Sequence, residues 1–250
     1  MSHFTVAVVT KDKNKLEEVL APYSEDLEVP RYIKYTKEQL IEKVKKEIED
    51  YKNSTYAKFL KDPIEYKNNC KNEFHIKYLE EEFPKKLNWT DEQIYQDEIK
   101  YYDEENIGEN GEVYSEYNPN SKWDWYDIGG RWRNQLLTRE DNNDTFEHNS
   151  FAEHMGKFKD TKEAPKGYKW VNGAKIKDID FNKIEEVNGE PFYTWALVDE
   201  NGWYEQGKMS WWAMSDATEE STNNFAKQFK EYVESVENQD KYLIIVDCHI

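Results

Sequence analysis

The sequence predicts an α+β protein, with a mostly antiparallel sheet that contains both chain termini as strands, a C-terminal packing helix and a helical insertion. Near the start, residues 3–9 alternate and are rich in β-branched side chains, which is typical of a strand. At the end, residues 242–250 form a nearly continuous apolar run, which is typical of a strand buried on both faces. We therefore expect the two ends of the chain to lie close together as inner strands of one sheet.

The region between the first strand and the rest of the sheet has a helical pattern. Thr36 begins a helix whose apolar residues recur at helical spacing, Asp62-Pro63 begins a second helical piece, and Thr90 begins a third. We interpret residues 36–105 as a helical insertion within a single α+β domain of residues 1–250.

The sequence after the insertion has turn signals between apolar segments, which is typical of β-structure, and then predicts a helix and a final strand. Three Asn-Gly pairs are hairpin signals between apolar segments: Asn172-Gly173, Asn188-Gly189 and Asn201-Gly202. Residues 192–198 and 203–205 flank the last pair and predict a hairpin. Residues 217–236 predict a packing helix, with one apolar face made of Phe225, Phe229, Tyr232, Val233 and Val236.

The chain is strongly acidic, and the acid is unevenly distributed. The 250 residues include 52 acidic and 34 basic side chains, which gives a formal net charge of −18. Such a charge disfavours broad binding to DNA or RNA, because phosphates are repelled. Residues 91–116 hold ten acidic residues against one lysine. That segment is typical of a solvated surface and a loop, with mimicry of nucleic-acid charge as the alternative.

Targeting signals and cysteine usage favour a cytoplasmic protein. No stretch approaches the length of apolar sequence needed for a membrane-spanning helix, so we expect no membrane association. The N-terminus has neither a basic region before its apolar run nor a small-residue cleavage site, which argues against secretion. Two cysteines, Cys70 and Cys248, are too few for a disulfide framework or a cysteine-based zinc site.

Six of the nine tryptophans fall in two short segments, residues 121–133 and 203–212. On a strand, Trp123 and Trp125 would share one face, and Lys122 and Tyr126 the other. Aromatic rings together with arginines after a glycine pair suit a planar, phosphorylated ligand, because bases stack on rings and guanidinium groups grip phosphate. The predicted ligand-binding residues are Lys122, Trp123, Trp125, Tyr126, Arg131, Trp132, Arg133, Trp211 and Trp212. The alternative is that the tryptophans are core and that the arginines pair with carboxylates.

Two histidines at the chain ends are the candidate catalytic residues. If the terminal strands are neighbours, His3, Thr5, Asp247 and His249 converge. Histidines can perform acid–base chemistry at neutral pH, so His3 and His249 would be general acid and base, or metal ligands with Asp247. The alternative is that both are strand-end histidines satisfied by local hydrogen bonds. We predict no dedicated metal site and no cofactor.

His3-Phe4-Thr5-Val6 also matches one of the paired H-x-T-apolar motifs of two-histidine phosphoesterases. A second copy is required, and His148-Asn149-Ser150-Phe151 fits it only loosely. The chain contains no P-loop, G-x-G-x-x-G, H-E-x-x-H or G-x-S-x-G motif.

The chain resembles a family of bacteriophage and prophage proteins that begin MSHFTV, carry an N-P-x-S-K-W-D-W-x-x-I-G-G-R-W core and end in D-C-H-I. The segments that carry the resemblance are MSHFTVAVV at 1–9, LAPYSEDLEV at 20–29, NPNSKWDWYDIGGRW at 118–132, GKMSWW at 207–212 and VDCHI at 246–250. The resemblance implies a phage accessory protein acting in the host cytoplasm. It brings no assigned catalytic residues.

These observations lead to one leading hypothesis and two alternatives. The leading hypothesis is an anti-defence protein that binds and sequesters a small nucleotide immune signal, such as a cyclic dinucleotide or an ADP-ribose derivative. The first alternative is a phosphodiesterase that cleaves such a nucleotide. The second is an acidic protein–protein inhibitor of a host defence protein, acting through residues 91–116. Whether the protein is an enzyme and whether it forms a homo-oligomer stay open at this point.

Overall fold

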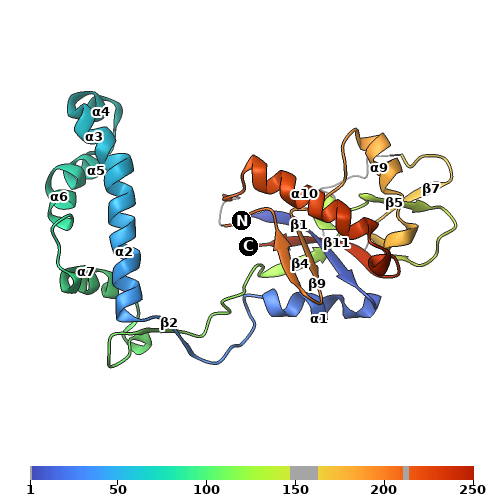
Figure 1. The fold of residues 1–250 in the computed structure, drawn as a ribbon, viewed down its shortest axis with the longest axis horizontal. Helices are drawn as coiled ribbons and strands as arrows, with labels where there is room; N and C mark the ends of the chain where they lie inside the picture. Colours follow the sequence, from blue (N-terminus) through green and yellow to red (C-terminus); the bar gives the residue numbers. More distant parts are fainter. Residues whose placement is uncertain (1, 147–162, 211–213) are drawn as a thin grey trace. The chain divides into compact units, whose positions relative to one another are not determined.

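The protein, described here by a computed structural model over residues 2–146, 163–210 and 214–250, divides into two compact units (Figure 1). The sheet unit comprises Met1–Glu28 and Tyr117–Ile250, and the helical unit comprises Val29–Glu116. The expected α+β class with a mainly antiparallel sheet is confirmed. The helical unit contains all of residues 36–105, and it also includes the short segments on either side of them.

The main sheet is built around the first and the last strand. β1 (His3–Thr10) and β11 (Tyr242–His249) are antiparallel neighbours, and their register places His3 opposite His249 and Thr5 opposite Asp247. Both are inner strands, as expected from their apolar sequences. The strand order is β10-β9-β1-β11-β8-β6, with β4 also paired to β11. The other strands of this sheet are β4 (Trp125–Ile128), β6 (Thr145–Phe146), β8 (Gly173–Lys175), β9 (Ala196–Asp199) and β10 (Gly202–Glu205).

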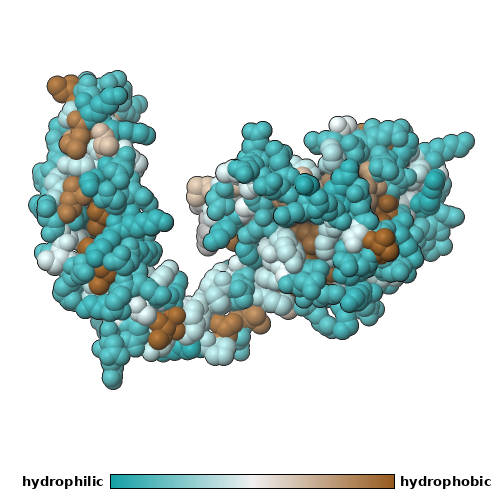
Figure 2. All heavy atoms as spheres, viewed as in Figure 1, coloured by the Kyte–Doolittle hydropathy of each residue, from teal (hydrophilic) through white to brown (hydrophobic). Residues whose placement is uncertain are grey.

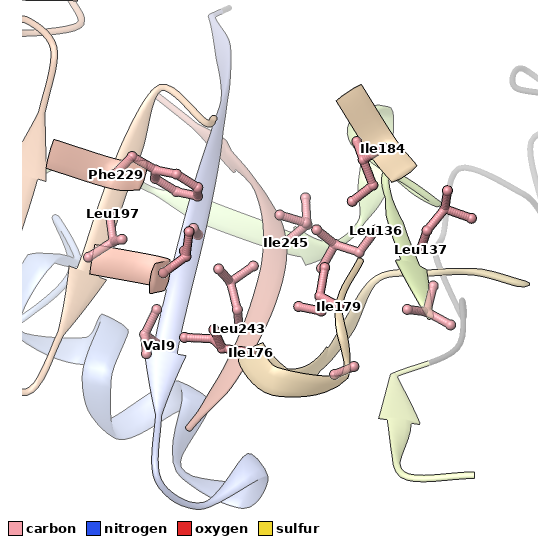
Figure 3. Packing of buried hydrophobic residues seen from close by; sticks show 14 of the residues in the cluster. Val9, Leu136, Leu137, Ile176, Ile179, Ile184, Leu197, Phe229, Leu243 and Ile245 are labelled. Carbon is pink, nitrogen blue, oxygen red and sulfur yellow. The ribbon is translucent and has the colours of Figure 1, made fainter. Parts of the chain in front are cut away.

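Both faces of the sheet are covered, which explains the uninterrupted apolar runs. On one face, Val9, Leu243 and Ile245 pack against α10 (Glu219–Glu234) and α9 (Phe181–Asn188), as Figure 3 illustrates. A two-stranded sheet of β5 (Leu136–Arg139) and β7 (Tyr168–Val171) completes that core. On the other face, Val6, Val8 and Val246 pack against α1 (Leu16–Leu20). Each such buried side chain contributes about 1.5–3 kcal/mol of transfer free energy.

The predicted packing helix is confirmed, with one correction at its end. α10 begins at a capping box, in which the Thr218 hydroxyl accepts from the Ser221 amide. Phe225, Phe229 and Val233 are buried, as the apolar spacing predicts. Val236 is not on that face, because Ser235 is extended and ends the helix, and the Val236 side chain is exposed.

One of the three hairpin signals is correct. Asn201-Gly202 joins β9 to β10 as an antiparallel hairpin, although β9 begins only at Ala196. The hairpin at Asn188-Gly189 is wrong, because Gly189 is the left-handed C-cap of α9 and its amide donates to the Glu185 carbonyl. The hairpin at Asn172-Gly173 is also wrong, because β7 and β8 belong to different sheets.

The helical unit is organised around α2 (Lys37–Tyr51), whose start at the Thr36 capping box is as predicted. Leu40 and Ile41 of α2 pack against α7 (Asp91–Glu98), which begins after Thr90, also as predicted. The further helices are α3 (Ala57–Lys61), α4 (Pro63–Asn69), α5 (Glu73–Lys77) and α6 (Phe83–Lys86). A two-stranded sheet of β2 (Tyr32–Tyr35) and β3 (Val113–Ser115) closes the unit. Across the described ranges, no helix combines the length and apolarity that a membrane crossing requires.

Candidate functional site

The centre of the candidate site is a pair of histidines on the first and last strands. His3 and His249 face each other across β1 and β11, with ring centroids 4.9 Å apart and ring planes at 74°. Their side chains are only 9% and 5% exposed. The register of the two strands therefore brings into contact two residues that are almost the whole chain apart in sequence.

Each histidine is held by its own carboxylate. His3 Nδ1 lies 2.9 Å from Asp247 Oδ1, and His249 Nδ1 lies 2.6 Å from Asp124 Oδ1. An ionised carboxylate can only accept, so each Nδ1 carries the proton and donates it. Nε2 is then the nitrogen that can exchange a proton with a ligand. The Nε2 atom of His249 is buried and has no hydrogen-bond partner within the described residues.

Asp124 is a site residue that sequence reasoning missed. β4 begins only at Trp125, so strand alternation does not describe Asp124. The Asp124 amide donates to the His249 carbonyl, and this bond brings the carboxylate to the imidazole. The only local signal is the position of Asp124 between two tryptophans, which says nothing about a partner at the far end of the chain.

Asp247 is positioned by the glycine turn that follows β4. Its Oδ2 accepts from the Arg131 amide at 2.9 Å, while its Oδ1 accepts from His3. Gly130 lies directly against it, since an added Cβ would be 2.4 Å from the Asp247 Cβ, and the Gly130 φ is +48°. The turn therefore requires glycine for both its backbone conformation and its contact with Asp247.

The other side of the same turn packs against Asn172, whose Asn-Gly sequence predicts a hairpin. Asn172 is fully buried, and its Oδ1 accepts from the Asn134 amide at 2.7 Å. A Cβ on Gly129 would be 2.6 Å from that oxygen. Both glycines thus lie against buried polar side chains, and together they fix the turn from which Arg131 projects.

Trp125 extends the histidine pair towards solvent. Its indole stacks on His249 with ring centroids 5.0 Å apart and planes at 17°, and its edge meets His3 at 5.3 Å. The Trp125 side chain remains 44% exposed. Arg131 is exposed as well, and its guanidinium forms no ion pair with any residue of the described ranges. An exposed aromatic ring therefore adjoins the histidines, and the exposed Arg131 follows in the chain from a backbone amide that is bonded to Asp247.

Three of the predicted ligand residues lie elsewhere. Trp123 packs in the core on the α1 side, and its Nε1 donates to the Leu20 carbonyl at 3.2 Å. Tyr126 meets Trp123 edge to face, and burial raises the pKa of Tyr126 to about 12. Lys122 is paired with Glu205 at 2.6 Å. The expectation that Trp123 and Trp125 share a strand face is wrong, because Trp123 precedes β4.

The remaining predicted ligand residues divide into buried and undescribed ones. Trp132 packs against the core on the α10 side, and Arg133 is buried. Both follow the glycine turn, which carries the chain from the sheet into the core. Trp211 and Trp212 lie outside the described residues, as does His148 of the loose second phosphoesterase motif.

Cys248 is excluded as a nucleophile although it lies between Asp247 and His249 in sequence. Its side chain points to the opposite face of β11, among the residues packed on the α1 side. Burial raises the pKa of this thiol well above its ordinary value, so it stays protonated. The chemistry of the site is therefore carried by the imidazoles.

Neither a metal-binding cluster nor a known relative assigns a function to this site. Within the part of the chain that the structure describes, no group of three or more His, Cys, Asp and Glu side chains is placed to hold a metal ion. No protein-family model, no curated protein and no solved structure matches the chain.

Proposed function

We propose that this protein is a nucleotide phosphodiesterase in which His3 and His249 are the general acid and base. The observation that supports it best is the pair of adjacent imidazoles, each held through Nδ1 by a separate carboxylate. An imidazole whose tautomer is fixed in this way presents Nε2 for proton transfer, which contributes typically about 10²–10⁴-fold to a rate.

The reaction divides between the two rings. A neutral Nε2 takes the proton of the attacking hydroxyl, from water or from the substrate, as its oxygen bonds to phosphorus. The bond from phosphorus to the leaving oxygen breaks, and that oxygen takes the proton from the protonated Nε2 of the other ring. The net proton transfer is from nucleophile to leaving group, and no further reactant is needed.

The surroundings of the pair favour a small anionic nucleotide. The outer face of Trp125 is available to a base, which would gain about 1–3 kcal/mol by stacking. The Arg131 guanidinium is available to a phosphate. A ligand oxygen at His249 Nε2 would supply the hydrogen-bond partner which that buried atom lacks. The resemblance to phage proteins favours an immune nucleotide of the host cytoplasm as substrate.

Sequestration of the same nucleotide is the second candidate. The observation that favours it is that Trp125 and Arg131 are exposed and can contact a ligand, whereas the side chains of the two histidines are only 9% and 5% exposed. Trp125 and Arg131 would serve in either case, so variants at these two positions do not separate the candidates.

The test is incubation of the protein with a panel of cyclic dinucleotides and ADP-ribose derivatives, followed by chromatography of the products. Wild-type protein should convert at least one, with a bell-shaped dependence on pH, and His3→Ala with His249→Ala should abolish conversion. His75→Ala in the helical unit is the matched control. Unchanged turnover in the double variant would contradict the proposal, whereas binding below about 10 μM without product would favour sequestration.

A further inference from the structure

The two ends of the helical unit differ in charge and in apolar exposure. α3, α4 and α5 form one end of the unit, and α7 with β2 forms the other, at the two ends of α2 (Figure 1). With 15 residues, α2 separates them by about 22 Å. We name them the lysine end, residues 52–77, and the acidic end, residues 91–116.

The lysine end is basic and apolar in an otherwise acidic chain. It contains six lysines against three carboxylates, whereas the whole chain carries −18. Lys58, Lys61 and Lys71 form no ion pair within the described ranges. Phe74 is 88% and Ile64 75% exposed, and Leu60 is exposed as well. Figure 2 shows apolar atoms on the surface at this end.

The internal packing of the lysine end leaves these apolar residues outward. Tyr66 of α4 lies between Phe59 and His75, with ring centroids 5.7 Å and 6.2 Å away. Those rings hold the three short helices together, so Leu60, Ile64 and Phe74 are not needed for that packing. Exposed apolar side chains of this size among unpaired lysines are typical of an interaction surface.

The acidic end offers the complementary surface. Part of its acid is neutralised within the unit, since Asp91, Glu92 and Glu98 pair with lysines of α2. The remaining carboxylates that are exposed and form no ion pair in the described ranges are Asp103, Glu104, Glu105, Glu109 and Glu116. An exposed aromatic ring, Tyr101, lies among them. Each end therefore carries both the charge and the apolar area that the other requires.

We propose that the helical unit binds a second copy of this chain, antiparallel, with the lysine end of each copy on the acidic end of the other. A twofold axis across α2 makes both contacts at once, so the assembly closes as a dimer and does not extend as a filament. Charge complementarity selects this occupant, and Phe74, Ile64 and Leu60 supply its apolar contact. This inference goes beyond the proposed function and uses none of its residues.

The test is the molar mass of the full-length protein by light scattering after gel filtration, at about 0.05 M and 0.5 M NaCl, because salt screens the contact. Wild type should be a dimer at low salt and dissociate at high salt. The triple variant Lys58→Glu, Lys61→Glu, Lys71→Glu should be a monomer, and so should Glu104→Lys, Glu105→Lys, Glu109→Lys. Mixing the two variants should restore a dimer. In the mixed dimer, the lysine end that now carries glutamates lies on the acidic end that now carries lysines, and the other contact joins two unchanged ends, so both contacts are attractive.

Two further variants isolate the surface. Phe74→Ser should raise the dimer dissociation constant about tenfold or more, since a buried phenyl ring is lost. Lys166→Glu with Lys227→Glu and Lys230→Glu makes the same charge change on the sheet unit and should leave the dimer intact. A wild-type monomer at about 100 μM in low salt would overturn the proposal. A lysine-end triple variant that remains dimeric would overturn it too, because another surface would then join the copies.

Discussion

Asp247 of the sheet unit and Glu49 of the helical unit are carboxylates that are held in opposite ways. Asp247 has a side chain only 3% exposed and accepts from a histidine and from a backbone amide. Glu49 of α2 is 56% exposed and pairs with Lys52 one turn away. Water can replace the partner of Glu49, but it cannot reach Asp247. Burial therefore makes Asp247 part of the internal geometry of the sheet unit, whereas Glu49 contributes charge to the surface of the helical unit.

The largest expected effect is the loss of Asp247. Asp247→Ala leaves the His3 Nδ1 and the Arg131 amide without their acceptor, and should lower the free energy of unfolding by about 4 kcal/mol. Glu49→Ala is the matched change in the helical unit, and no measurable loss is expected because the pair of Glu49 with Lys52 is exposed to solvent. Urea unfolding followed by circular dichroism measures both. Similar losses in the two variants would remove the distinction between the two units.

The next effect tests whether the glycine turn positions Asp247. Gly130→Ala should lower the free energy of unfolding by about 3 kcal/mol. This loss is the sum of the backbone strain of alanine at a positive φ and of the clash between its Cβ and Asp247. Gly189→Ala is the control, since Gly189 has a φ of +82° but nothing within 4 Å of an added Cβ. The control should lose about 1 kcal/mol, the cost of the backbone alone. Nitrogen-15 NMR of the His3 ring should also show a disturbed tautomer in Gly130→Ala and not in Gly189→Ala.

The smallest effect concerns Asp144, a carboxylate of the sheet unit that is partly exposed. Hydrogen bonds from Tyr242 and Lys13 are the main causes that lower the pKa of Asp144 from 3.8 to about 2. Asp144 contributes fully to the free energy of unfolding at pH values above its pKa in the unfolded chain. This contribution is lost as the pH falls through its pKa in the folded protein. At 38% exposure, we expect at most about 1 kcal/mol between wild type and Asp144→Asn at pH 7.

That difference should shrink between pH 4 and pH 2, as Asp144 of the wild type becomes protonated. Urea unfolding of both proteins at pH 7, 4 and 2.5 measures it, and the other carboxylates cancel because both proteins contain them. A difference that stays constant down to pH 2.5 would assign the role of Asp144 to packing. A value near that of Asp247→Ala would show that exposure does not separate the two kinds of carboxylate.

Local sequence patterns predicted the elements that depend on local physics. The β-branched alternation of residues 3–9 and the nearly continuous apolar run of residues 242–250 predicted two inner strands, since strands covered on both faces are rich in apolar residues. The helix starts after Thr36 and Thr90 could be predicted because the residues that cap a helix lie within three positions of one another, and the structure has a capping box at each. The convergence of His3 and His249 was foreseen only under the condition that the two strands pair.

The rest of the site depends on side-chain hydrogen bonds between segments that are far apart in the chain. Such bonds produce no periodic pattern in the amino-acid sequence. Asp124 reaches His249 from just outside a strand, where alternation does not apply. Asn172-Gly173 predicts a hairpin because Asn-Gly is a turn signal, but the buried Asn172 side chain accepts from the Asn134 amide and so supports another turn. Trp123 was grouped with Trp125 by alternation, and the start of β4 between them separates a core residue from a site residue.

The pairing of the first strand with the last also determines when the site can exist during synthesis. His3 and Asp247 are separated by 244 positions, so during synthesis the partner of His3 is made 244 residues after it. Contacts of such long range are intrinsically slow to form. A chain that ends before residue 247 lacks both His249 and the Asp247 carboxylate that holds His3, so the site is assembled only after the residues of β11 have been made.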